Sequence, residues 1–237
     1  MIKISSKDNQ VFKYLKKLSL KKYRDQAKEY LVFGKDFIDE AIKTKTLLYV
    51  FTCDENTVDA TYFFESGLFN IIQNSSDHKI GALVKMNNEI DFTLSNKILV
   101  LDSVQDPANV GMLLRSALAF GFSTIVASKG CADYYNEKTI KASKGSLFHL
   151  NLLNRNLDSF LNIAKDLGYD LYFADTKQGS FSNNNKNKSI LLLGNEGNGI
   201  SQQLLTIPHN KIHINTLKVE SLNVAIAGAI IMYEMSK

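Results

Sequence analysis

The chain has 237 residues, of which 45% are hydrophobic and 22% charged, a composition typical of a globular protein with one large domain or two small ones. No apolar run is long enough to span a membrane, and the first ten residues lack the apolar core of a signal peptide, so we expect a cytoplasmic protein. Cys53 and Cys131 lie far apart without metal-ligand or redox spacing, which predicts two free thiols and no metal site.

The net charge of +4 is distributed unevenly along the chain. Residues 1–30 hold nine Lys and Arg against three Asp and Glu. Between Val11 and Arg24, basic and apolar residues are interleaved at roughly helical spacing. Such a helix either lays its cations along a nucleic-acid backbone or presents an ordinary solvated basic face. The candidate nucleic-acid contacts in this stretch are Lys13, Lys16, Lys17, Lys21, Lys22 and Arg24.

The first part of the chain mixes helical and strand-like patterns. We expect helices over about 11–30, over Lys35–Lys43 and around Thr61–Gly67, a strand over Leu47–Cys53, and an apolar segment over Lys79–Met86. The polar stretch at 87–97 is typical of a linker. It divides the chain into a smaller domain at 1–90 and a larger domain at 96–237.

From Lys97 onward, apolar strands alternate with helices. The expected strands are Lys97–Val104, Thr124–Ser128, Asp170–Asp175, Ser189–Gly194 and Lys211–Asn215, and the expected helices are Pro107–Gly121, Leu157–Gly168 and Ser221–Met235. Ser180–Ser189 is a polar loop. This alternation predicts an α/β fold with a parallel sheet covered by helices on both faces.

Three segments carry polar residues where such strands end, which is where open parallel sheets bind ligands. In the first, Asn109 and Arg115 are six residues apart, about 120° around a helix, so they share a site only if Asn109 lies in the loop or first turn. The alternative is a helix cap and a surface ion-pair partner. Only three of the 28 basic side chains are arginines, so Arg115 suggests a planar set of donors for a phosphate.

The second segment, Leu191–Ser201, places three glycines after a buried strand, where they allow close backbone approach to a ligand. It is neither a dinucleotide fingerprint nor a P-loop, which argues against a nucleotide-binding α/β protein; the other interpretation is a turn with a structural Glu196. In the third, Val219–Ala229, Ser221 is a good N-cap and Asn223 lies in the first turn of an apolar helix. An unpaired amide there costs a few kcal/mol, so Asn223 needs a partner.

Together these segments resemble the motifs of the SpoU (TrmH-like) branch of the SPOUT methyltransferases. Asn109 and Arg115 match the first motif, Leu191–Ile200 the second and Ser221–Tyr233 the third. The similarity covers about 97–235, and KASKGSLFHL at 141–150 resembles a further family segment. More loosely, LVFGKDFIDEA at 31–41 resembles the small L30e-like substrate-binding domain often fused in front of such enzymes.

This resemblance implies transfer of a methyl group from S-adenosylmethionine to a ribose 2′-hydroxyl of RNA, by a trefoil-knotted homodimer. RNA rather than DNA is the substrate, since DNA lacks that hydroxyl. The fused first domain favours ribosomal RNA, with transfer RNA as the alternative substrate. A non-catalytic RNA-binding or ribosome-assembly protein on the same fold is the alternative from another class.

The resemblance also assigns residues. It implies that the cofactor is bound by Gly194, Asn195, Glu196, Gly197, Ile214, Leu222 and Asn223. The implied catalytic residues are Arg115, Asn109, Glu196, Ser221 and Asn223. The strand before the third motif lacks the proline and glycine of the family pattern, so either Ile214 or His213 occupies its contact position. A guanidinium is a poor base, so we expect Arg115 to grip an RNA phosphate bidentately.

Overall fold

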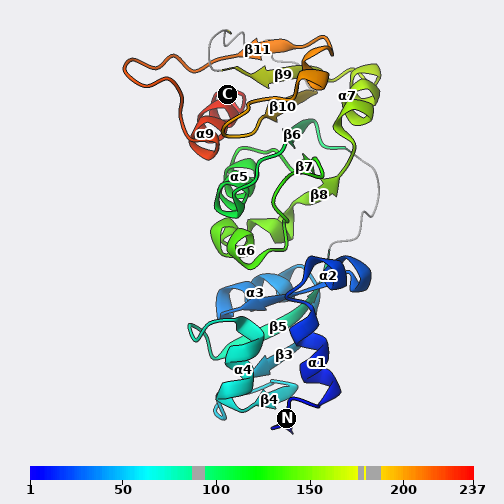
Figure 1. Cartoon of the computed structure of the whole chain (residues 1–237), viewed down its shortest axis with the longest axis vertical. Helices are drawn as coiled ribbons and strands as arrows, with labels where there is room; N and C mark the ends of the chain where they lie inside the picture. The colour runs from blue at the N-terminus through cyan, green and yellow to red at the C-terminus, as the bar shows by residue number, and fades with distance from the viewer. Residues whose placement is uncertain (87–93, 176–178, 180–187) are drawn as a thin grey trace. The chain divides into compact units, whose positions relative to one another are not determined.

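The computed structural model describes residues 1–86, 94–175, 179 and 188–237, which form two compact units, each with its own sheet (Figure 1). Most of the expected linker at 87–97 and most of the polar loop at 180–189 lie outside the described residues, and Lys97 already begins the first strand of the second unit. Within the described ranges, no helix is long and apolar enough to cross a membrane.

The N-terminal unit is a five-stranded mixed sheet with helices packed against it. Its strands are β1 (Ile2–Ile4), β2 (Glu29–Phe33), β3 (Leu47–Thr52), β4 (Tyr62–Phe64) and β5 (Ile80–Lys85), in the order β1-β4-β3-β5-β2. Its helices are α1 (Gln10–Lys17), α2 (Lys21–Ala27), α3 (Lys35–Lys43) and α4 (Ser66–Gln73). Phe12 and Leu15 of α1 and Phe69 of α4 join Phe51 and Phe64 in one buried cluster. Burying this face of α1 leaves its lysines exposed.

The single basic helix expected over about 11–30 is wrong. The helix ends at Lys17, α2 begins at Lys21, and β2 begins at Glu29. Arg24 explains the break, because its Nη1 donates to the carbonyl oxygens of Leu18 and Ser19 at 2.7 Å each and so satisfies groups that the helix end leaves unpaired. Arg24 is only 6% exposed, so its assignment to the RNA surface is corrected to a structural role.

The short helix expected around Thr61–Gly67 is also displaced. Tyr62–Phe64 is strand β4, and α4 begins only at Ser66. Three consecutive aromatic residues suit a half-buried pleated surface, and packing of Phe64 against Phe51 (ring centroids 5.9 Å apart) holds the strand in the sheet.

The C-terminal unit is a six-stranded, wholly parallel sheet, as the sequence predicts. Its strands are β6 (Lys97–Leu101), β7 (Thr124–Ala127), β8 (Asn151–Asn154), β9 (Asp170–Ala174), β10 (Ser189–Leu193) and β11 (Asn210–Ile212), in the order β11-β9-β10-β6-β7-β8. Its helices are α5 (Pro107–Ala119), α6 (Glu137–Ser143), α7 (Leu157–Asp166), α8 (Gln202–Leu205) and α9 (Val224–Glu234), with a short 3₁₀ helix at Ser146–His149.

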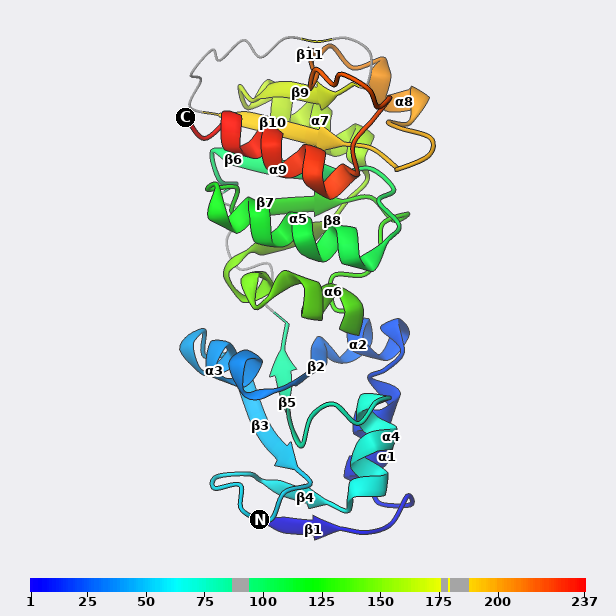
Figure 2. The ribbon, with the colours of Figure 1, turned by 90° about the vertical axis from the view of Figure 1, so that its left-hand side faces the viewer.

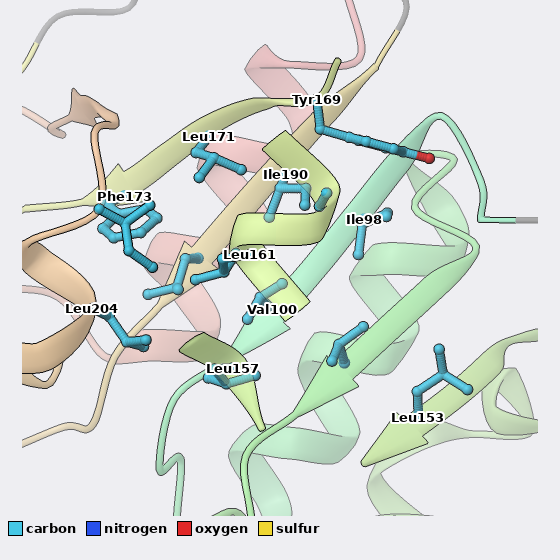
Figure 3. Close-up of a cluster of buried hydrophobic side chains, with 14 residues drawn as sticks. Ile98, Val100, Leu153, Leu157, Leu161, Tyr169, Leu171, Phe173, Ile190 and Leu204 are labelled. Carbon is cyan, nitrogen blue, oxygen red and sulfur yellow. The ribbon is translucent and has the colours of Figure 1, made fainter. Parts of the chain in front are cut away.

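Both faces of this sheet are covered. On one face, Leu157 and Leu161 of α7 pack with Ile98, Val100 and Ile190 of the central strands (Figure 3). On the other face, α5 and α9 lie side by side (Figure 2). Burial on both sides explains why these strands are continuously apolar rather than alternating.

Helix α6, the 3₁₀ helix and strand β8, which lie between β7 and α7, were not predicted from the sequence. α6 packs closely on α5 at Gly111, where an added Cβ would lie 2.5 Å from the Cβ of Ala142. The family-like segment at 141–150 thus contains the end of α6 and leads into β8.

Candidate functional site

Two of the three motifs follow neighbouring parallel strands of the C-terminal sheet. β6 and β10 pair in register from Lys97 with Ser189 to Leu101 with Leu193. Their carboxyl ends therefore meet at one edge, and the backbone N–H of Asp102 extends the pairing by donating to Leu193 O at 2.9 Å. The third motif leads into α9, which packs against α5 and β10. All three motifs converge on this edge of the sheet.

A chain of side-chain hydrogen bonds joins the three motifs. Oδ1 of Asn223 accepts from the backbone N–H groups of Ala225 (2.9 Å) and Ile226 (3.3 Å), which makes Asn223 the N-cap of α9. Its Nδ2 donates to Oδ1 of Asn109 at 3.0 Å. Nδ2 of Asn109 in turn donates to Oε1 of Glu196 at 2.9 Å. These bonds link one residue from each motif, and Asn109 is bonded to both of the others.

The donors in this series of hydrogen bonds all point the same way, from Asn223 through Asn109 to Glu196. Because Oδ1 of Asn223 is committed to the helix N-terminus, its amide nitrogen must face Asn109. The amide of Asn109 must then present its oxygen to Asn223 and its nitrogen to Glu196, whose carboxylate is an acceptor only. Asn109 is 4% exposed, so losing either partner would leave a buried polar atom unsatisfied. Asn223 is exposed, so its amide is not forced by burial to find a partner, but it has one in Asn109.

The helix caps differ from those expected. Ser221 precedes α9 and is exposed, while Asn223 is the cap rather than a first-turn residue. α5 is capped by Asp106, whose carboxylate accepts from Ala108 N at 2.9 Å. Asn109 is therefore not a cap but lies in the first turn of α5, which is the condition for a shared site with Arg115.

Arg115 lies further along α5 and is exposed. Within the part of the chain that the structure describes, no acidic side chain forms an ion pair with it, so the alternative of a surface ion-pair partner is not observed.

The glycine-rich segment forms a tight loop closed on itself. The backbones of Asn195 and Gly199 exchange two hydrogen bonds, at 2.9 and 3.0 Å. Oδ1 of Asn195 accepts from the backbone N–H groups of Gly197 (3.0 Å) and Asn198 (2.9 Å). A Cβ on Gly194 would lie 2.4 Å from the carbonyl carbon of Gly199, so a larger residue cannot occupy this position without opening the loop. The tip of the loop is exposed.

Two residues at this edge were not predicted as site residues. Asp102 is 5% exposed, and its Oδ2 accepts from Ser201 N at 2.8 Å while its Oδ1 accepts from Ser103 Oγ at 3.2 Å. The carbonyl oxygen of Ser103 accepts from Nδ2 of Asn195 at 2.8 Å. The sequence suggested a continuous apolar strand over 97–104; an acidic residue inside such a strand was the available signal.

The remaining predicted cofactor contacts lie in the segment between β11 and α9. Ile214 and Leu222 are half-buried there. Nδ1 of His213 lies 3.0 Å from Asp175 O, which ties this ring to the end of β9. Below the edge, Cys131 donates to Leu101 O at 3.2 Å, and burial raises the pKa of its thiol, which argues against a nucleophilic role.

Comparisons with known proteins show which family the chain belongs to. Residues 96–233 match the model of the SpoU rRNA Methylase family. The chain is 31% identical to the 23S rRNA (guanosine(2553)-2′-O)-methyltransferase RlmP of Bacillus subtilis, over 99% of both chains. A putative RNA methyltransferase of the TrmH family from Porphyromonas gingivalis superposes with a TM-score of 0.80 at 29% identity, over 94% of this chain and 96% of that one.

An AdoMet-bound rRNA methyltransferase from Sinorhizobium meliloti shares the fold, with a TM-score of 0.85 at 20% identity over 98% of this chain and 96% of that one. The family model covers more than half of the chain, and the Bacillus subtilis relative aligns along nearly all of it. The chain belongs to the SpoU methylase family.

Proposed function

We propose that this chain transfers a methyl group from S-adenosylmethionine to a ribose 2′-hydroxyl in ribosomal RNA. The observation that supports this most is the hydrogen-bonded chain from Asn223 through Asn109 to Glu196, which unites the three motifs at the ligand-binding edge of the sheet. Ribosomal RNA is favoured over transfer RNA because the Bacillus subtilis relative, named for 23S rRNA, aligns with the N-terminal unit as well.

The residues present fit the cofactor. When bound, S-adenosylmethionine supplies an electrophilic methyl group on a positively charged sulfonium. The loop at 194–199 offers exposed backbone at glycines, where a ligand can approach closely. Ile214 and Leu222 offer apolar surface for an adenine, and the carboxylate of Glu196 offers a negative charge to a cationic ligand.

Arg115 is proposed to hold the RNA. Methyl transfer needs in-line positioning and removal of the hydroxyl proton. A guanidinium is a poor proton acceptor but an excellent bidentate donor to phosphate, and that of Arg115 is exposed. Arg115 and the phosphate that it grips would together polarise the 2′-hydroxyl, while Asn109, Ser221 and Asn223 orient the ribose and the cofactor.

The N-terminal unit is proposed as an L30e-like RNA-binding domain. Lys16 and Lys17 of α1 and Lys22 of α2 are exposed, and Nζ of Lys17 lies 5.8 Å from the centre of the Tyr23 ring. Lys13 and Lys21 are also exposed but pair with Asp8 and Asp25 in the free protein. These cations provide contacts to RNA phosphates, and such contacts do not depend on the base sequence of the RNA.

We propose that the chain acts as a homodimer in the cytoplasm. Ile226 and Tyr233 form an exposed apolar stripe on α9, and Met112 and Leu118 flank Arg115 on the exposed face of α5. Such a surface is typical of a subunit interface. Light scattering on a purified sample should give twice the mass of the chain, and Ile226→Glu should give the monomer mass.

The enzymatic proposal is tested by transfer of labelled methyl from S-adenosylmethionine to total RNA from cells lacking the gene, fractionated by size. Label in a ribosomal RNA band is expected. Label in the transfer RNA band would retain the reaction and contradict the substrate. No label in free RNA or in assembling ribosomal subunits, with measurable cofactor binding, would support the non-catalytic alternative.

A further inference from the structure

The loop at 194–201 is attached at both ends to two consecutive residues that follow another strand, β6. Near its start, Nδ2 of Asn195 donates to the carbonyl oxygen of Ser103 at 2.8 Å. At its end, the backbone N–H of Ser201 donates to Oδ2 of Asp102 at 2.8 Å. Both anchors follow β6, which pairs directly with the strand that precedes the loop. The two residues after β6 therefore hold both ends of the loop in place.

Asp102 is itself held firmly in place. Its backbone N–H donates to Leu193 O at 2.9 Å, which continues the strand pairing, and Ser103 Oγ donates to its other carboxylate oxygen at 3.2 Å. The side chain is 5% exposed, so solvent cannot replace these bonds easily. Ser103 adopts a left-handed conformation (φ 58°) and donates its backbone N–H to Ser128 Oγ at 2.9 Å. Ser103 is thus also held by Ser128, the residue that follows a third strand, β7.

We propose that Asp102 is a positioning residue that keeps the loop at 194–201 in its cofactor-binding form before the cofactor arrives. This inference rests on the proposed function, because it assigns the loop to S-adenosylmethionine. Fixing a loop in its bound conformation improves affinity by removing the entropic cost of ordering it on binding. Asp102 does so through geometry, by accepting from Ser201 and Ser103, rather than by its charge.

Two substitutions at this position separate geometry from charge. Asp102→Ala removes both acceptors. Asp102→Asn removes the charge but preserves the arrangement, since the amide oxygen can accept from Ser201 N and the amide nitrogen can donate to the hydroxyl of Ser103. The matched control is Asn156→Ala, which removes the side chain that caps α7 and so destabilises the same unit without altering the loop, Asp102 or Ser103.

The first readout is amide hydrogen exchange in the cofactor-free protein, followed at Asn195, Gly199 and Ser201, whose N–H groups close the loop or anchor it. Asp102→Ala should raise their exchange rates about tenfold, the effect of losing roughly one net hydrogen bond. Asp102→Asn and Asn156→Ala should leave these rates within about threefold of wild type, although Asn156→Ala lowers the melting temperature.

The second readout is the dissociation constant of S-adenosylmethionine, measured by calorimetry. We expect it to rise about tenfold in Asp102→Ala and to recover in Asp102→Asn. Unchanged exchange in a folded Asp102→Ala would overturn the proposal, and so would an Asp102→Asn variant as defective as Asp102→Ala. If the wild-type protein does not bind the cofactor, the proposed function fails, while the exchange rates still decide whether Asp102 orders the loop.

A second variant serves if Asp102→Ala does not fold. Ser201→Pro replaces the N–H donor on the loop side by the ring Cδ, which cannot fit where the hydrogen bond to Asp102 runs, so the loop end must separate from the carboxylate. The φ of −60° at Ser201 is itself one that proline adopts. The substitution should weaken cofactor binding and speed exchange at Gly199. Wild-type affinity and exchange in this variant would contradict the proposal.

Discussion

Replacing Asn223 by aspartate changes one atom of the hydrogen-bonded chain and keeps the shape of the side chain. The oxygen that accepts from Ala225 and Ile226 remains, so α9 keeps its cap. The amide nitrogen that donates to Oδ1 of Asn109 at 3.0 Å becomes an oxygen. Two acceptors then face each other, and reversing the amide of Asn109 only transfers the conflict to Glu196.

The structure sets the size of the effect. The cap contributes almost nothing to the change, because Asn and Asp are equally good at an N-cap and a negative charge is favourable there. Losing the bond to Asn109 removes about 1 kcal/mol, and the unsatisfied acceptor costs roughly 1–3 kcal/mol more. A loss of about 2–4 kcal/mol in the arrangement of the site corresponds to about a 30- to 1,000-fold fall in kcat/KM.

The assay is methyl transfer to RNA, read beside thermal unfolding. Asn223→Asp should stay folded but lose at least about tenfold in kcat/KM, with a melting temperature lowered by about 4–16 °C. The matched control is Asn156→Asp, which places the same substitution at the cap of α7, where Asn156 accepts from Ser159 N at 3.0 Å. The control should keep full activity. More than half of the wild-type activity in Asn223→Asp would refute the role of the hydrogen bonds that link Asn223, Asn109 and Glu196.

Three further predictions follow from the geometry of the C-terminal unit. Arg115→Lys keeps the charge but loses the planar donors, so turnover should fall more than tenfold with unchanged cofactor affinity; near-wild-type activity would argue against bidentate phosphate binding. Gly194→Ala should abolish cofactor binding in calorimetry, because its Cβ would lie 2.4 Å from a loop carbonyl carbon, whereas Gly67→Ala, whose Cβ meets no atom within 4 Å, should bind normally. Leu161→Ala removes a fully buried side chain and should lower the free energy of unfolding by about 2–5 kcal/mol, and Ile163→Ala, 60% exposed on the same helix, should cost less than about 1 kcal/mol; equal losses would contradict the packing in Figure 3.

The parallel sheet could be predicted from sequence because its strands are apolar on both faces, and runs such as KILVL and SILLL are explained by little else. The N-terminal unit was harder to predict. Basic and apolar residues keep a helical period from Val11 through Arg24, and nothing local shows that the side chain of Arg24 folds back on the carbonyl groups of Leu18 and Ser19. The break between α1 and α2 thus depends on a side-chain contact between residues five and six positions apart, which helical periodicity does not reveal.

The candidate site was predictable only in part. Asn109, Glu196 and Asn223 could be named because polar residues at those places are not needed for packing. The order in which they are hydrogen-bonded depends on which amide atom of Asn223 caps α9. Asp102 was not predicted, because its value as an anchor depends on Ser201, 99 residues away in sequence. Contacts of that range follow from strand order, which the sequence pattern does not specify.

The chemistry of the methylated position tests the central claim most directly. RNA labelled by the wild-type protein with S-adenosylmethionine is hydrolysed with alkali, which needs a free 2′-hydroxyl to cleave the neighbouring phosphodiester. Methylation of a ribose predicts that the label is recovered in uncleaved dinucleotides. Label recovered in mononucleotides would place the methyl group on a base and contradict the proposed reaction.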